Sequence, residues 1–319
     1  MPSFYTNDIH LYMQLIRGLH NLKSQPNGCA LTIGNFDGAH LGHQQIIASL
    51  VKQAQKLNLS TCLMSFEPLP QEYFQQDAPA RLTRLREKWC ALQAQQLDQF
   101  LCIKFDHVLA ELSGDDFIQQ ILVNQLNVKY LLVGDDFRFG KDRQGNFDLL
   151  KQAGKKYGFE VQDSPSHCFA GERISSTRIR QALNNEQFEL ANNMLGRPYH
   201  ICGKVAHGAK RGRTIGFPTA NIRLLRHATP LNGVYAVALI DEQKNSHQGV
   251  ANIGRRPTVN GQHLQLEVHL FNFDTDIYGQ QVCVEFKHKI RNEQRFDSFE
   301  ALHQQIIHDS EQAKEFFAL

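Results

Sequence analysis

Apolar and polar positions follow two different patterns along this chain, and the change comes near residue 190. In the first half, short runs that are apolar throughout alternate with segments whose apolar residues recur at helical spacing. The runs predict strands at 29–36, 60–66, 100–105, 128–134 and near 159–162, and the intervening segments predict helices at 43–58, 87–97, 113–126 and near 147–157. Strands that are apolar on both faces and alternate with helices predict an α/β domain, a Rossmann-like parallel sheet covered on both sides.

The second half predicts strands that follow one another with short turns. The candidate strands are YHICGKVAHG, GVYAVALI, HQGVANIG, LQLEVHLFN and QVCVEFKHKI. In LQLEVHL every second residue is apolar, the period of an antiparallel strand with one polar face. We therefore expect a small antiparallel β-barrel, followed by a terminal helix that begins after Ser298. Gly196 and Pro198 interrupt the chain between the two patterns, which predicts two domains, 1–190 and 191–319.

Composition narrows the class of protein. The 319 residues carry a formal net charge of +2, which gives no general basic field for nucleic acid. No apolar run has the length of a membrane span, and the N-terminus lacks the core of a signal peptide. The seven cysteines are scattered singly, so we expect reduced thiols in a cytoplasmic protein.

The stretch IGNFDGAHLGH, at the end of the first predicted strand, carries the first candidate chemistry. Gly34, Gly38 and Gly42 surround a predicted helix start, and His40 and His43 lie one helical turn apart. Unpaired N–H groups and the helix dipole make such a turn an anion site, and glycine lets a phosphate approach the backbone. Two interpretations stay open: a phosphate site in which the imidazoles donate to oxygen, or a glycine-rich connection with two surface histidines.

A second helix start lies in GERISSTRIRQAL. It combines Ser176 and Thr177 with Arg173 and Arg180. Hydroxyl caps flanked by arginines suit a phosphate, and the same residues also suit a well-capped surface helix with solvated arginines. Two such helix starts in one α/β domain favour a nucleotide as the ligand.

These strings together resemble a known family. GNFDGAHLGH, FEPLP, GDDFRFGKDRQG and ISSTRIR, in this order, resemble the adenylyltransferase module of the bacterial bifunctional riboflavin kinase/FAD synthetases. GAKRGRTIGFPTANI, followed by GVYAV, GVANIGRRPT, LEVHLF and IRNEQRF, resembles the family's riboflavin kinase module. The resemblance covers about residues 12–318 and implies a nucleotidylyltransferase-type N-terminal domain. It also implies Mg²⁺, with ATP, riboflavin, FMN and FAD as substrates or products.

The resemblance implies that the N-terminal domain transfers AMP from ATP to FMN and releases pyrophosphate. The FMN phosphate is already ionised, so the site needs positioning and charge neutralisation rather than a base. His40 and His43 are then expected to stabilise the transferring phosphate. Arg173, Ser176 and Thr177 are expected to hold the leaving phosphates. The remaining candidates are Gly34, Asn35, Phe36, Asp37, Gly38 and Arg180 for the nucleotide, and Asp136 and Phe137 for the flavin.

Two positions depart from the family pattern. FEPLP has Leu69 where the family usually carries histidine, which implies weaker phosphate binding or compensation elsewhere. Asn146 stands in place of the acid that closes the FRFG-containing string, a smaller departure.

The resemblance implies that the C-terminal domain phosphorylates riboflavin with ATP. The attacking hydroxyl keeps its proton at neutral pH, so a base within hydrogen-bond reach helps this step. Glu267 matches the family's catalytic glutamate, and Thr219 and Asn221 match its pair for Mg²⁺ and phosphate. A flap over the phosphates is expected from Gly208, Gly212 and Gly216, with charge from Lys210, Arg211 and Arg213. Arg291 is a further nucleotide-binding candidate.

Three classes of function are compared. The first is the bifunctional transferase. The second is a riboflavin kinase with a degenerate N-terminal module that binds nucleotide without transferring AMP, an alternative that Leu69 keeps open. The third, a nucleic-acid-binding protein on a synthetase-like fold, is disfavoured by the near-neutral charge. We expect small-molecule partners only, no nucleic acid or membrane, and a monomer or weak homo-oligomer.

Overall fold

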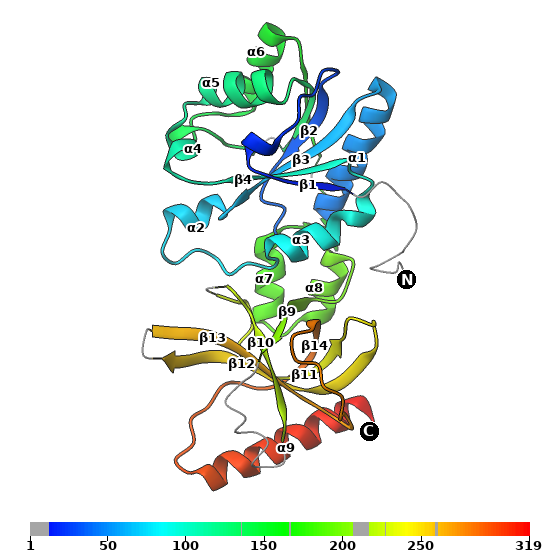
Figure 1. Cartoon of the computed structure of the whole chain (residues 1–319), viewed down its shortest axis with the longest axis vertical. Coiled ribbons are helices and arrows are strands. Elements are labelled where there is room, and N and C mark those ends of the chain that lie inside the picture. The colour runs from blue at the N-terminus through cyan, green and yellow to red at the C-terminus, as the bar shows by residue number, and fades with distance from the viewer. Residues whose placement is uncertain (1–12, 135, 166, 207–216, 227, 259–260) are drawn as a thin grey trace. The chain divides into compact units, whose positions relative to one another are not determined.

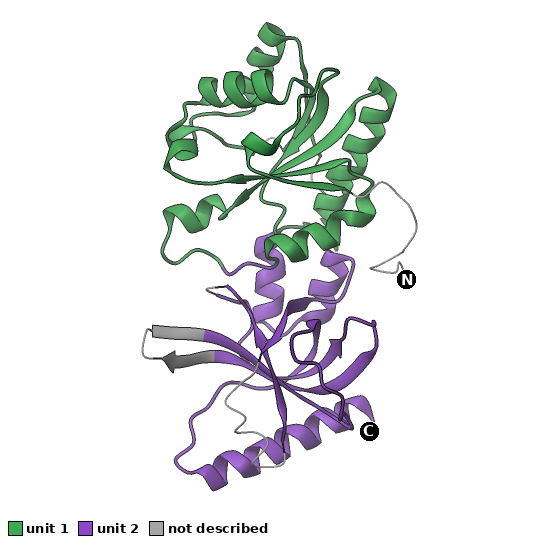
Figure 2. Ribbon diagram, in the orientation of Figure 1, with its two compact units in different colours: residues 1–79, 83–175 green, residues 80–82, 176–319 purple. Residues whose placement is uncertain are grey.

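The computed structural model divides the chain into two compact units (Figures 1 and 2). It describes residues 13–134, 136–165, 167–206, 217–226, 228–258 and 261–319. Unit 1 contains residues 1–79 and 83–175, and unit 2 contains residues 80–82 and 176–319.

Unit 1 is built on a six-stranded sheet in which every neighbouring pair of strands is parallel. Its strands are β1 (Gln14–Arg17), β2 (Cys29–Ile33), β3 (Ser60–Glu67), β4 (Gln99–Lys104), β5 (Val128–Val133) and β6 (Glu160–Asp163). The order in space is β1-β4-β3-β2-β5-β6. The strand order reverses beside β2, at the kind of switch point where open α/β sheets bind their ligands.

Helices cover both faces of this sheet. They are α1 (Leu41–Leu57), α2 (Pro70–Phe74), α3 (Leu85–Leu92), α4 (His107–Glu111), α5 (Gly114–Asp116), which continues as a π-helix (Phe117–Gln125), and α6 (Phe147–Tyr157). Single 3₁₀ turns lie at Leu19–Asn21, Gln93–Gln95 and Lys141–Arg143, and β7 (Cys168–Phe169) forms a hairpin with β8 (Glu172–Arg173). One apolar cluster joins Ala30 and Leu63 to Leu50 of α1. A second cluster joins Leu31 to Ile118, so successive residues of one strand pack against opposite layers.

Unit 2 contains the expected barrel, and the predicted fold class is confirmed for both halves. The barrel strands are β9 (His200–Ala206), β10 (Thr219–Arg223), β11 (Gly233–Ile240), β12 (Ser246–Thr258), β13 (Gly261–Leu270) and β14 (Gln281–Arg291). They close in the order β10-β13-β12-β11-β14-β9, with antiparallel pairs. The terminal helix α9 (Phe299–Phe317) begins where predicted, since the Ser298 hydroxyl accepts a hydrogen bond from the Ala301 N–H at 3.1 Å.

Two further helices, α7 (Ser176–Asn184) and α8 (Phe188–Leu195), belong to the barrel unit by their packing. The Phe188 ring meets the buried Tyr235 ring edge-on, with the centroids 6.0 Å apart. Lys289 of β14 forms an ion pair with Glu186 at 3.1 Å. The main boundary between the two compact units thus lies at residue 176. The expected boundary between the two functions, at residue 190, stays a prediction.

The expectation that every cysteine is a reduced thiol is wrong for one pair. Cys202 and Cys283 form a disulfide, and the remaining cysteines are thiols. The two positions lie 81 residues apart in sequence. They become direct neighbours only because the barrel places β9 and β14 side by side in this register. Single cysteines without a recognisable spacing give no sign of such a pairing.

Candidate active sites

The connection between β2 and α1 is a tight turn with left-handed backbone. Phe36, Gly38 and Ala39 have φ angles of +47°, +85° and +43°. A side chain at Gly42 would also crowd the helix start, because a Cβ atom there would lie 3.2 Å from Nδ1 of His40. Gly38 and Gly42 therefore serve the turn geometry itself, while the expected approach of a phosphate to this backbone stays a prediction.

The buried carboxylate of Asp37 fixes this turn through hydrogen bonds to Thr83. Oδ1 of Asp37 accepts hydrogen bonds from the backbone N–H and the hydroxyl of Thr83, at 2.9 and 3.2 Å. The Thr83 hydroxyl in turn accepts from the N–H of Gly38 at 2.8 Å. Asp37 is 2% exposed. Sequence reasoning grouped Asp37 with the nucleotide ligands and did not notice Thr83, whose importance depends on a contact across 46 residues.

The two histidines come together at the N-terminus of α1. His40 is the N-cap residue, and its Nδ1 accepts a hydrogen bond from the N–H of His43 at 3.3 Å. The two rings stack with their centroids 3.5 Å apart and an interplanar angle of 15°. An accepting Nδ1 carries no proton, so the hydrogen of a neutral His40 ring lies on Nε2. His40 thus combines helix capping with a ring donor.

Lys88 contacts the turn that carries these candidates and was not among the residues singled out in the sequence. Its ammonium donates to the carbonyl oxygen of Asn35 at 2.5 Å and to the Ser65 hydroxyl at 3.1 Å. The Ser65 hydroxyl also donates to the Asn35 carbonyl, at 3.2 Å. Lys88 is only 2% exposed, and lysine is almost never fully buried unless it is paired. The sequence offered one sign of this role, because Lys88 lies on the apolar face of the helix predicted at 87–97.

The segment that leads into the ISSTRIR string lies beside the same helix start. A Cβ atom on Gly42 would lie 3.7 Å from the carbonyl oxygen of Ile174. The next residue back, Arg173, pairs with Asp136 at 3.2 Å, and both side chains are more than half exposed. An ion pair this exposed contributes little to stability. The exposure also leaves both groups accessible to a ligand. Phe137 stacks on Phe139, with the ring centroids 5.5 Å apart.

The hydroxyl part of the second string falls in unit 2. Ser176 and Thr177 occupy the first turn of α7, with Thr177 exposed. Arg180, on the same helix, donates from Nε to the carbonyl oxygen of Ala80 at 2.6 Å. The guanidinium therefore anchors the short 80–82 segment, in addition to any role with phosphate.

The two departures from the family pattern have different surroundings. Leu69 is 5% exposed, and its hydrocarbon side chain offers no polar group to a phosphate. Its backbone N–H donates to the Glu72 carboxylate at 2.9 Å. Asn146 is the N-cap of α6, and its Oδ1 accepts from the N–H of Leu149 at 2.9 Å. Asparagine and aspartate are nearly equivalent caps, which accounts structurally for the second departure.

In the barrel, the candidate kinase residues meet on one face of adjacent strands. Asn221 of β10 lies directly opposite Glu267 of β13. The Gln265 amide bridges them, donating from Nε2 to Asn221 Oδ1 at 2.6 Å and to Glu267 Oε1 at 3.1 Å. Thr219 lies two residues before Asn221, opposite His269. Gln265 lies on the polar face of LQLEVHL, and the sequence gives no sign of its bridging contact because that contact depends on the strand register.

His269 closes this cluster on the side of Thr219. A carbonyl oxygen can only accept, so His269 Nδ1 donates to the Pro218 oxygen, at 2.9 Å. Burial lowers the pKa of His269 from its usual 6.5, although this hydrogen bond opposes the shift. The ring is therefore neutral near pH 7.

A pocket of about 390 Å³ adjoins the start of β10. Its walls are largely apolar, with polar groups from Thr219, Asp274, Asp276 and Tyr278. Pockets that combine apolar walls with a few polar groups are typical binding sites for small molecules.

The last candidates divide between a described and an undescribed part of the chain. Arg291 forms a two-pronged contact with the buried Asp309 of α9, from Nε to Oδ1 at 2.8 Å and from Nη2 to Oδ2 at 2.7 Å. This contact gives Arg291 a structural role between β14 and α9. The predicted flap residues Gly208, Lys210, Arg211, Gly212, Arg213 and Gly216 lie outside the described residues.

Comparison with known proteins adds family membership to this geometry. The family model described as FAD synthetase matches residues 22–178, and the model described as riboflavin kinase matches residues 195–317. Proteins named bifunctional riboflavin kinase/FMN adenylyltransferase are similar over 96% of this chain and 99% of their own length. The one from Haemophilus influenzae is 55% identical, and the one from Escherichia coli K12 is 51% identical.

A solved structure supports the fold over the same span. A crystal structure titled macrolide-efflux protein, from Streptococcus pneumoniae, is 30% identical with a TM-score of 0.76, covering 95% of this chain and 99% of that one. Within the described parts of the chain, no helix combines the length and apolar character needed to cross a bilayer.

Proposed function

The chain belongs to the family of bifunctional riboflavin kinase/FMN adenylyltransferases, and from that premise we propose how its residues divide the two reactions. The enzyme phosphorylates riboflavin to FMN with ATP, and it adenylylates FMN to FAD with a second ATP, releasing pyrophosphate. We assign adenylyl transfer to residues 1–190 and the kinase reaction to residues 191–319. The ranges matched by the two family models support this division.

For adenylyl transfer, we assign phosphate binding to the turn between β2 and α1. A phosphate oxygen of FMN attacks the α-phosphorus of ATP, and pyrophosphate leaves. The Nε2–H of His40 and the ring of His43 donate to the transferring phosphate at the positive end of the helix. Arg173, beside Asp136, neutralises charge on the leaving pyrophosphate. Phosphates that are already ionised make a general base unnecessary here.

For the kinase reaction, the observation that carries the assignment is the meeting of Asn221, Gln265 and Glu267 on one face. Glu267 takes the proton from the attacking ribityl hydroxyl, and the Gln265 amide fixes the orientation of its carboxylate. The Gln265 nitrogen can only donate, so Asn221 presents its carbonyl oxygen to this cluster.

The oxygen atoms of Thr219 and Asn221 suit Mg²⁺, which prefers hard oxygen ligands. When bound with ATP, Mg²⁺ would neutralise charge on the transferred phosphoryl group. We assign the adjoining pocket to the adenine ring of the ATP used by the kinase, since Thr219 lines its wall.

The test of the kinase site is Glu267→Gln. Glutamine keeps the size and an oxygen that accepts from Gln265, and it removes the base. We expect FMN formation to fall by about 10²-fold or more, while FAD formation from supplied FMN continues. Glu285→Gln is the matched control, because Glu285 lies in the same barrel and pairs with Lys287 instead. A Glu267→Gln enzyme with wild-type kinase turnover would refute the assignment.

The alternative of a kinase with a degenerate N-terminal module is not favoured, because the FAD synthetase model matches the N-terminal half and the similar bifunctional proteins span the whole length. The buried Leu69 keeps it testable: incubation with riboflavin, ATP and Mg²⁺ is expected to yield both FMN and FAD. FMN alone would support the alternative. We further propose a cytoplasmic enzyme that acts as a monomer or weak homo-oligomer and does not bind nucleic acid.

A further inference from the structure

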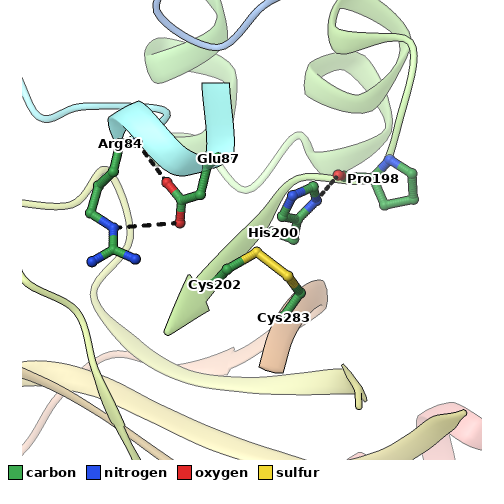
Figure 3. The surroundings of a disulfide bond; sticks show 6 residues. All are labelled: Arg84, Glu87, Pro198, His200, Cys202 and Cys283. Carbon is green, nitrogen blue, oxygen red and sulfur yellow. Dashed lines mark hydrogen bonds and ion pairs between the residues drawn. A yellow bond between two sulfur atoms is a disulfide. The ribbon is translucent and has the colours of Figure 1, made fainter. Parts of the chain in front are cut away.

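The disulfide pair lies next to a histidine, and none of these three residues is assigned to either reaction. His200 and Cys202 are two residues apart on β9, and Cys283 lies directly opposite Cys202 on β14. The alternating residue Ile201 and the β14 neighbours Val282 and Val284 are buried in the barrel. The three polar side chains therefore share its outer face, where all are partly exposed. Figure 3 shows the His200 ring beside the disulfide.

The spacing of the three ligand atoms suits a single metal ion. The two sulfur atoms and a ring nitrogen all lie within 4.8 Å of one another. Zinc binds thiolate sulfur at about 2.3 Å and imidazole nitrogen at about 2.0 Å, so neighbouring ligands on a tetrahedral ion lie about 3.3–3.8 Å apart. Once the disulfide is reduced, small side-chain rotations bring the sulfur atoms to that separation.

The hydrogen bonding of His200 also favours a ligand role. The Pro198 carbonyl oxygen lies 3.1 Å from Nδ1 of His200, and a carbonyl can only accept (Figure 3). In the neutral form of the ring Nδ1 therefore carries the proton, which leaves the lone pair that a metal requires on Nε2. Metal-binding histidines typically donate their other ring N–H to a backbone carbonyl or a carboxylate in this way.

We propose that the reduced chain binds one thiophilic divalent cation of the zinc class at His200, Cys202 and Cys283, and that the disulfide is the oxidised, metal-free state of the same site. On binding, two thiols lose their protons to solvent and form two metal–thiolate bonds, with water as the fourth ligand. On oxidation by a low-molecular-weight disulfide, the protein disulfide forms and two small thiols are released, which balances the exchange. The proposed cytoplasmic location favours the reduced, metal-binding state.

The experiment uses the full-length protein, reduced, freed of metal with a chelator, and titrated with Zn²⁺ without nucleotide. We expect one equivalent to bind, with release of about two protons measured by calorimetry in two buffers. Cys202→Ser is expected to abolish stoichiometric binding. His200→Ala, which leaves the disulfide possible, is expected to weaken binding at least about tenfold. Cys168→Ser removes an exposed thiol elsewhere and is the matched control.

Oxidation gives the second arm of the test. Treating the metal-free protein with oxidised glutathione is expected to form the disulfide and eliminate Zn²⁺ binding, and prior saturation with Zn²⁺ is expected to slow that oxidation. Absence of a stoichiometric site in the reduced protein would overturn the proposal. Wild-type affinity in either Cys202→Ser or His200→Ala would overturn it as well, because the ion would then be held elsewhere. Circular dichroism of each variant excludes misfolding as the cause of a lost site.

Discussion

Replacing Lys88 by methionine tests whether a buried ammonium sets the geometry of the turn between β2 and α1, to which we assign phosphate binding. Methionine retains most of the aliphatic stem, so packing changes little, while the bonds to the Asn35 carbonyl and the Ser65 hydroxyl are lost. Hydrogen bonds to a charged group contribute about 1.5–3 kcal/mol each. Two such bonds therefore contribute about 3 kcal/mol at the lower end of that range.

Two effects reduce this loss. The variant no longer has to bury a charged ammonium, and the Asn35 carbonyl keeps the Ser65 hydroxyl as a donor. We therefore expect a net loss of about 2 kcal/mol in the interactions that hold the turn. If this loss is carried in full into the free energy of the transition state for adenylyl transfer, kcat/KM for FAD formation from FMN decreases about 30-fold.

The assay measures FMN-to-FAD and riboflavin-to-FMN conversion separately on each purified variant, with urea unfolding to determine stability. FMN formation from riboflavin is expected to stay unchanged. Lys52→Met is the matched control, because Lys52 is an exposed residue on α1 of the same unit. Wild-type FAD formation by Lys88→Met would refute the argument that Lys88 positions the turn. An equal loss of both activities would indicate general unfolding instead.

Three further predictions follow from other parts of the chain. We expect His40→Asn, which keeps a capping acceptor and removes the ring donor, and His43→Ala each to lower FAD formation from FMN at least about tenfold, with FMN formation unchanged. Replacement of the exposed His107 by alanine is the control, and unchanged FAD synthesis would show that the two histidines take no part in the reaction. Fragments starting at Ser176 and at Ala191 should both convert riboflavin to FMN, but the shorter one should melt at a lower temperature because it lacks the Phe188–Tyr235 contact; equal melting temperatures would show that α7 and α8 do not stabilise the barrel. Because burial lowers the pKa of His269, the unfolded chain takes up a proton below pH 6.5 that the folded chain does not, so the free energy of unfolding should decrease as the pH falls below that value. Urea unfolding at about pH 7.5 and about pH 5.5 should show a smaller decrease in His269→Gln, and an identical pH dependence in the two proteins would contradict this.

Local pattern was sufficient for most of the fold. The fully apolar runs of the first half define β2 to β5, because a strand buried on both faces has no polar position to mislead the assignment. The alternation in LQLEVHL placed Glu267 on the polar face opposite the buried Leu266 and Val268. The edge strand β1 went unrecognised, because its four residues are too few to establish a period.

The candidate sites were visible in the sequence wherever their residues are close together in the chain. The glycines and histidines of IGNFDGAHLGH occupy one turn and one helix start, so the sequence alone located this candidate site and left open whether it binds phosphate or is a glycine-rich connection with two surface histidines. The Asn146 cap and the Ser298 cap are likewise interactions within four residues.

Only the tertiary structure decided which distant residues support those sites. Thr83 reaches Asp37 across 46 residues, Lys88 reaches Asn35 across 53, and Gln265 reaches Asn221 across 44. Strand register likewise set Cys202 opposite Cys283 and so determined a disulfide that spacing could not predict. The physical reason is that hydrophobic periodicity specifies which face of an element is buried, whereas a side-chain contact depends on the register and packing of elements that come together only when the chain folds.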